Sequence, residues 1–181
     1  MAKRKAKAKI SKKKERTDAG LLVSDRVQLK DVRLISSKCD QTPGATSGKK
    51  AYDISYSTEV QVDRKSGYVV VIARFHFEAY IGSKTSEPVV LIDASFLLSY
   101  TIEDFEGLTQ KGFERFANLN GIYNAWPYWR EFVQNTIVRM GLPSLSIPVF
   151  RIVETPDKKT VKRKTSKKKA RKKAVSKKQN E

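Results

Sequence analysis

Cysteine and histidine are nearly absent from this sequence of 181 residues, which contains one of each, Cys39 and His76. A single cysteine excludes an intramolecular disulfide and a four-cysteine zinc site, and a single histidine excludes a metal site with two histidine ligands. We therefore expect no metal and no cofactor. One unpaired thiol is typical of proteins in a reducing compartment, which predicts a cytoplasmic protein.

Long apolar runs are missing too. No stretch approaches the ~20 consecutive apolar residues that span a bilayer as a helix, so we expect no insertion into a membrane. The first 20 residues are basic but contain no apolar stretch. They therefore do not have the pattern of a secretory signal.

Acidic residues are scarce at the two ends of the chain, and the net charge of +18 comes from there. Residues 1–16 carry nine Lys or Arg and one acid (net +8), residues 157–181 carry thirteen and two (net +11), and the residues between them have a net charge of −1. Neither end has the apolar periodicity needed to offset the entropy of ordering. We expect disordered basic tails at 1–20 and 157–181, and one folded domain at 21–156.

The tails by themselves support one hypothesis about function. Dense Lys and Arg attract nucleic acid through its phosphates. The attraction is non-specific where aromatic residues for base stacking are absent, as they are in both tails. A polyanion-binding protein that acts through its lysine-rich tails therefore stays open as an alternative, beside the simpler interpretation of solvated tails that raise solubility.

Between the tails, four segments alternate apolar and polar side chains, as half-buried β-strands do. They cover residues 26–39, 51–63, 68–81 and 90–102. The alternation changes phase near Lys30 and Asp31, which predicts a β-bulge in the first strand. Short connections join the last three strands, so the pattern predicts an antiparallel meander.

After residue 102 the period becomes helical. Thr109 is placed to cap a short helix that Gly121 would end, and Asn124 to cap a second helix. The second helix has apolar residues at spacings of three and four residues, which places them on one face. Gly141 and Pro143 predict the end of this helix. The predicted fold class is α+β: a four-stranded antiparallel sheet, a meander, packed by C-terminal helices.

No motif for catalysis is present. Gly44 and Gly48 are separated by three residues instead of the four of a phosphate-binding loop, and Lys50 stands where that loop needs Ser or Thr. The acidic cluster at 103–106 precedes a predicted helix, where carboxylates favour the helix start electrostatically. We therefore expect a protein that is not an enzyme.

Aromatic residues are what the sequence has in excess. Two Trp, seven Tyr and eight Phe have to be distributed over one sheet and two helices. Two helices cover a four-stranded sheet only in part. The surplus apolar surface predicts self-association or a groove for a partner.

Residues 124–152 resemble the SecB family of protein-export chaperones. The resemblance rests on WPYWRE at 126–131, on RMGLP at 139–143, and on the Leu/Pro segment that follows. Weaker matches at 91–94 and 100–107 extend it to about residues 24–152. It implies the SecB-like fold and a homotetramer built as a dimer of dimers. It also implies an ATP-independent holdase that keeps unfolded or precursor polypeptides soluble in apolar grooves.

The resemblance also assigns residues to roles. Groove or interface positions are Phe113, Phe116, Trp126, Trp129 and Phe132. Strand positions for subunit packing are Ile92, Ala94 and Phe96. Asp31, Leu91 and Asp93 match positions on which the export motor SecA docks in the family.

Other features depart from the family. Ile35 stands where a second acid is expected on the first strand, and the usual C-terminal helix and acidic tail are absent. These departures weaken the link to export but not the chaperone hypothesis. Some SecB-like proteins instead protect the antitoxin of a toxin–antitoxin module, which stays open as an alternative.

Overall fold

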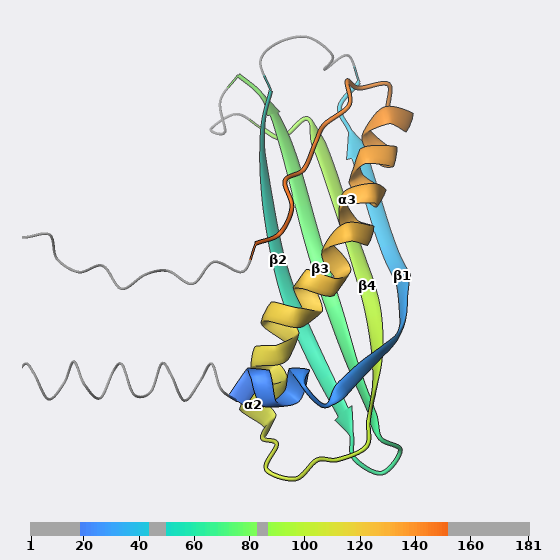
Figure 1. The fold of residues 1–181 in the computed structure, drawn as a ribbon. Helices are drawn as coiled ribbons and strands as arrows, with labels where there is room; N and C mark the ends of the chain where they lie inside the picture. The colour runs from blue at the N-terminus through green and yellow to red at the C-terminus, as the bar shows by residue number, and fades with distance from the viewer. Residues whose placement is uncertain (1–18, 44–49, 83–86, 152–181) are drawn as a thin grey trace, which may run out of the picture. The chain divides into compact units, whose positions relative to one another are not determined.

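The computed structural model describes residues 19–43, 50–82 and 87–151, which form an antiparallel sheet with a long helix across one face (Figure 1). The strands are β1 (Val27–Gln41), β2 (Lys50–Asp63), β3 (Tyr68–Ile81) and β4 (Val90–Ile102). The predicted α+β class is confirmed. The predicted tails lie outside the described residues, except for residues 19 and 20.

The strand order is β1-β4-β3-β2, so only β2, β3 and β4 form a meander. The predicted meander is therefore wrong for β1, which pairs with β4 at the edge of the sheet opposite to β2. Residues 42–49 connect β1 to β2, and a fully extended chain of that length spans at most about 26 Å at ~3.3 Å per residue. That length exceeds three inter-strand spacings of about 4.8 Å, so the chain can pass over two strands. The central strands β4 and β3 thereby gain a neighbour on both sides.

The register of β1 against β4 shifts twice. The first shift lies between Leu29 and Asp31, which confirms the predicted bulge, and the second lies between Leu34 and Ser36. Each extra residue reverses the side chains that follow it. The first shift places Val32 and Leu34, like Val27 and Leu29 before it, opposite buried residues of β4, and the second places the smaller Ser37 and Cys39 there.

We call the helix-covered side of the sheet the inner face and the other side the outer face. On the inner face, every second residue of β4, and of β3 up to Phe77, is buried, as the alternation predicts. The residues of these strands that form the core on the inner face are Val69, Val71, Ala73, Phe75, Phe77, Val90, Ile92, Ala94, Phe96, Leu98, Tyr100 and Ile102. No buried polar or charged side chain occurs among the described residues. The core is therefore apolar throughout.

Helices α2 (Gln110–Phe116) and α3 (Ile122–Arg139) are joined without a break by the π-turn η1 (Ala117–Gly121). The Thr109 hydroxyl accepts from the Gly112 amide at 3.2 Å, which confirms the predicted cap. The predictions that Gly121 ends a helix and that Asn124 caps one are wrong. Gly121 is helical, with φ −59° and ψ −49°, and the Asn124 amide donates to the Tyr100 hydroxyl at 3.2 Å.

The end of α3 has the geometry that Gly141 predicts. Gly141 has φ +69°, which favours glycine because other side chains are strained there. The Gly141 amide bonds to the Val138 carbonyl and the Leu142 amide bonds to the Ile137 carbonyl. This pair of bonds is a Schellman motif, and it turns the chain back toward the sheet.

Residues 19–24 form a helix that packs on α2. Val23 is fully buried, and a Cβ added at Gly112 would lie 2.9 Å from the Ala19 carbonyl oxygen. Residues 19 and 20, which the charge pattern assigns to the basic tail, thus belong to the folded domain. The sequence signal for the tail ends earlier, with Arg16.

Candidate functional site

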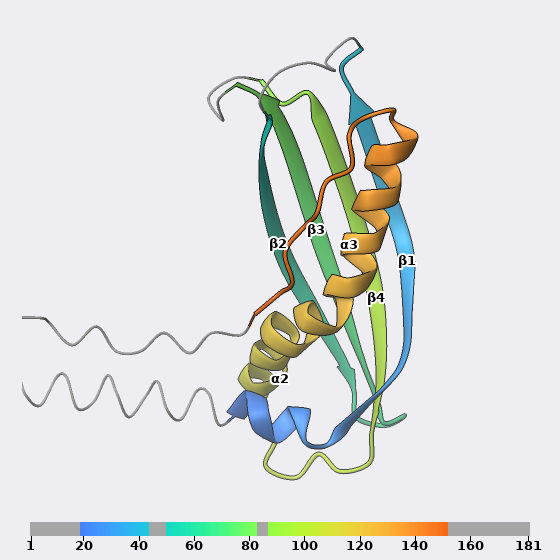
Figure 2. The same cartoon turned by 45° about the horizontal axis from the view of Figure 1, so that its top comes forward.

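The last described residues of the chain cross the inner face of the sheet. After Gly141, residues 142–151 form neither helix nor strand; we call this segment the strap. It passes beside α3 and over β3 and β2 (Figures 1 and 2). The strap therefore occupies the part of the inner face that α3 leaves uncovered.

Apolar side chains of the strap point into the protein at intervals. Ile147 is fully buried, Leu142 is buried, and Leu145 and Phe150 are half-buried. The residues between them are exposed. An elongated chain that inserts spaced apolar side chains in this way occupies an apolar groove, bordered by α3 on one side and by β2 on the other.

Two side chains of α3 hold the strap through its backbone. The indole Nε1 of Trp126 donates to the Pro148 carbonyl at 2.9 Å, and Nε of Arg130 donates to the Ile147 carbonyl at 2.8 Å. Trp126 and Arg130 are four residues apart, so they lie on the same face of the helix. Because every residue has a backbone carbonyl, these donors recognise an elongated chain without reading its sequence.

Aromatic rings form the floor of the groove. Phe75 of β3 stacks on Trp129 with centroids 5.0 Å apart and an interplanar angle of 9°, and it meets Trp126 at 5.8 Å. Phe150 of the strap meets Trp126 at 5.3 Å and Tyr56 of β2 at 5.9 Å. The strap ring therefore completes a cluster that the sheet and α3 build.

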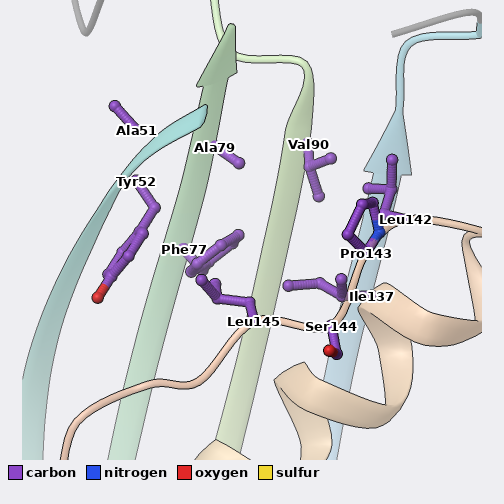
Figure 3. Close-up of a pocket in the computed structure, with 10 residues that line it drawn as sticks. All are labelled: Ala51, Tyr52, Phe77, Ala79, Val90, Ile137, Leu142, Pro143, Ser144 and Leu145. Atoms are coloured by element: carbon purple, nitrogen blue, oxygen red, sulfur yellow. The ribbon is translucent and has the colours of Figure 1, made fainter. Parts of the chain in front are cut away.

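A pocket of about 230 Å³ opens where the groove begins (Figure 3). Its lining is almost entirely apolar, and Leu145 of the strap lies beside Phe77 in it. The lining residues are Ala51, Tyr52, Phe77, Ala79, Val90, Ile137, Leu142, Pro143, Ser144 and Leu145. The pocket is smaller than the ~300–1,000 Å³ of most small-molecule sites. Its size and lining suit one or two apolar side chains.

The outer face carries the charged side chains. Asp31 and Asp93 are exposed there, Asp31 paired with Arg33 at 2.7 Å and Asp93 with His76 Nδ1 at 2.6 Å. His76 Nε2 also contacts Glu78 at 2.9 Å. Hydrogen bonds to Glu78 and Asp93 raise the pKa of His76 above its ordinary 6.5. Leu91 lies between the inward-facing Val90 and Ile92 of β4, so all three positions matched to SecA docking lie on this face.

The structure separates the other predicted site residues by burial. Phe113, Phe116 and Trp129 have essentially no exposed surface in the single chain, and Ile92, Ala94 and Phe96 lie beneath the helix on the inner face. Trp126 borders the groove, whereas Phe132 packs on Phe96 with centroids 6.4 Å apart. Of the eight positions, Trp126 is thus the one whose side chain touches the strap in the contacts described.

Other groove residues are ones that sequence reasoning missed: Tyr52, Tyr56, Leu145, Ile147 and Phe150. Leu145 and Ile147 alternate with serines between Pro143 and Pro148, and this pattern was a usable signal for a docked, elongated segment. The strand alternation also placed Tyr52 and Tyr56 on one face. It did not tell which face the helix covers.

Within 19–43, 50–82 and 87–151, no group of three or more His, Cys, Asp or Glu is placed to hold a metal ion. In the same ranges, no helix combines the length and hydropathy needed to cross a bilayer. The groove offers apolar contact area and two backbone-directed donors, which together can hold an elongated apolar polypeptide.

Comparisons with known proteins support the fold. No family model and no curated protein matches the chain. A solved structure of the Mycobacterium tuberculosis SecB-like chaperone Rv1957, in complex with a ChAD peptide from the antitoxin HigA1, matches with a TM-score of 0.67. The identity is 22%, over 76% of this chain and 99% of that one. A Streptococcus agalactiae protein of unknown function also matches, with a TM-score of 0.34 and 11% identity over 67% of this chain and 96% of that one. The chain therefore has the fold of the SecB-like chaperone.

Proposed function

We propose that this protein is an ATP-independent chaperone that binds unfolded polypeptides through their apolar segments and has no catalytic role. The observation that carries the proposal is the strap itself. An elongated segment with spaced apolar side chains lies in the groove, and the hydrogen bonds from Trp126 and Arg130 go to its backbone carbonyls. Contacts of this kind remove apolar area from water at about 25 cal/mol per Å² and discriminate little between sequences.

The fold supports the same proposal. The SecB-like chaperone of Mycobacterium tuberculosis was solved with a peptide of an antitoxin, so this fold accommodates a peptide from another protein. An antitoxin is one kind of client that we propose for this chain, and a precursor for export is the other. The chaperone activity itself does not depend on which of the two is bound.

We also propose that the chain assembles as a dimer of dimers. Tyr128 and Val138 are about half exposed on α3, and Leu29 and Leu34 are exposed on the inner face of β1. Both sets are large apolar side chains on regular elements, which suits contact between copies of the chain. The mass of the native particle tests this: a monomer at micromolar concentration would contradict it.

The chaperone proposal is tested by light scattering from thermally denaturing citrate synthase with increasing amounts of the full chain. We expect aggregation to be suppressed at near-stoichiometric ratios and to be nearly unchanged between about 50 and 200 mM salt, because apolar contacts are weakly screened. No suppression at any salt concentration would reject the proposal.

The charge distribution favours a second candidate function. Net charges of +8 at 1–16 and +11 at 157–181 would give non-specific binding to nucleic acid. Binding of a fluorescent single-stranded DNA should then weaken steeply over the same salt range. A DNA affinity that does not change with salt would rule out binding through the tails.

A further inference from the structure

We propose that the strap, residues 142–151, is a displaceable internal ligand of the groove and competes with clients for it. The inference rests on the proposed function, because it takes the groove to be the client site. It goes further in assigning the groove a resident occupant and in naming the contacts that hold both occupants.

The bonds that hold the strap are few. Among the described residues, the Leu142 amide makes the Schellman bond, and no backbone–backbone hydrogen bond joins residues 143–151 to the rest of the chain. Pro143 and Pro148 have no amide hydrogen, which disfavours pairing of the segment as a strand of the sheet. The strap therefore depends on its inserted side chains and on the two donors from α3.

The aromatic floor of the groove contains no residue of the strap. Phe75, Trp126 and Trp129 contact one another directly, so the aromatic floor belongs to the sheet and α3. The Trp126 and Arg130 donors would lose their acceptors if the strap left. Water would then take up these donors, whereas an incoming chain would restore both bonds and also cover the apolar floor, so the strap and such a chain compete for the same contacts.

The strap also indicates the chemistry of its competitor. Leu142, Leu145, Ile147 and Phe150 insert at intervals of two or three residues, and the residues between them stay exposed. A client of the same pattern is an elongated segment with a Leu, Ile or Phe at every second or third position and no charge at those positions. Such segments are common in unfolded proteins and are buried in folded ones.

Substitution of Ile147 tests whether the strap competes with ligands for the groove or is a fixed structural part of it. Ile147→Ser removes the fully buried side chain of the strap and leaves every groove residue of the sheet and α3 unchanged. The apparent affinity for a competing ligand is proportional to the fraction of molecules whose groove is free of the strap, so a change that loosens the strap raises it. We therefore expect I147S to bind a fluorescent apolar peptide about tenfold more tightly than the wild type. Val149→Ser is the matched control, because Val149 lies on the same segment but is 54% exposed, and it should bind as the wild type does.

The probe is a synthetic peptide with the sequence of residues 142–151, LPSLSIPVFR. It should bind I147S, and the same peptide with serine in place of Ile147 should bind at least about tenfold more weakly. In the I147S background, Arg130→Met should weaken binding of the peptide by about tenfold, because the substitution removes one donor to the peptide backbone and keeps an apolar side chain of similar length. Circular dichroism and thermal unfolding show whether each variant keeps the fold.

The outcomes distinguish the two proposals. If folded I147S binds the peptide no more tightly than the wild type, or loses binding, the strap is a fixed wall of the groove and the inference is wrong. If I147S binds the peptide but no variant suppresses aggregation of citrate synthase, the strap is displaceable and the chaperone proposal fails. If I147S binds the peptide and also suppresses aggregation at a lower ratio than the wild type, both proposals stand.

Discussion

Gly121, in the π-turn between α2 and α3, lies directly against Val71 of β3. A Cβ added at Gly121 would stand 2.9 Å from Cγ1 of Val71, closer than carbon atoms approach in proteins. The backbone of Gly121 is helical, so the glycine is required by close packing and not by a left-handed conformation. This contact brings the start of α3 onto the sheet.

Replacing Gly121 by alanine should therefore destabilise the protein. Alanine gains about 1 kcal/mol in helix propensity, but forced overpacking costs ~1–3 kcal/mol, so we expect a net loss of about 1 kcal/mol in the free energy of unfolding. Urea denaturation measures it. In a Val71→Ala background the clash is gone, and the same change should become stabilising. A Gly121→Ala effect of equal sign in both backgrounds would contradict the contact.

The tyrosines of the two sheet faces provide a test of the groove. Tyr56 is 46% exposed on the inner face beside Phe150, and Tyr68 is 49% exposed on the outer face. Tyr56→Ser should reduce the suppression of citrate synthase aggregation several-fold, because the groove loses one of the aromatic rings that line it. Tyr68→Ser, matched in exposure, should leave it unchanged. Equal losses in both variants would show that the groove does not bind the client.

Replacement by phenylalanine should change the free energy of unfolding by different amounts at the two tryptophans of α3. The Trp126 indole donates to the Pro148 carbonyl, whereas the buried Trp129 Nε1 has no hydrogen-bond partner within the described residues. A buried donor without a partner costs ~1–3 kcal/mol, so Trp129→Phe loses contact area but removes that cost. We expect a loss below about 1 kcal/mol in the free energy of unfolding, and ~3–5 kcal/mol for Trp129→Ala.

Trp126→Phe is the reference for that comparison, since it removes a donor that is in use. It should lower the free energy of unfolding by more than Trp129→Phe does. The reverse order, measured by urea denaturation, would mean that the Trp129 indole has a partner in solution.

The outer-face histidine should make stability depend on pH. As an imidazolium, His76 donates to Asp93 and Glu78, and these bonds raise its pKa above the unfolded value of 6.5. The resulting stabilisation is complete below pH 6.5 and is lost as the pH rises through the raised pKa. The bond to His76 also lowers the pKa of Glu78 below 4.5, so its stabilisation is present above that pH and is lost in more acidic solution.

Both contributions are therefore present between about pH 4.5 and 6.5. His76→Gln should lose stability in this window and approach the wild type at alkaline pH. Urea denaturation of both proteins across pH gives the difference. The single histidine also gives one imidazole signal for titration by NMR, and a pKa at or below 6.5 would contradict the network.

The local elements could be predicted from the sequence because each follows from neighbouring residues. The alternation in β3 and β4, the Thr109 cap and the Gly141 stop all appear as expected. The bulge at Lys30 is visible as a change of phase. The break predicted at Gly121 failed because a glycine in a helical pattern indicates either a helix end or a close contact, and the residue in contact, Val71, is fifty positions away.

What the sequence by itself determined is the period of each element, the position of the charge at the ends of the chain, and the excess of aromatic side chains. Only the tertiary structure decided that β1 pairs with β4 and that residues 142–151 lie on the inner face. The physical reason is distance along the chain. Side-chain periodicity is set by neighbours, whereas strand pairing and the filling of a groove are set by surfaces that meet only after the chain has folded.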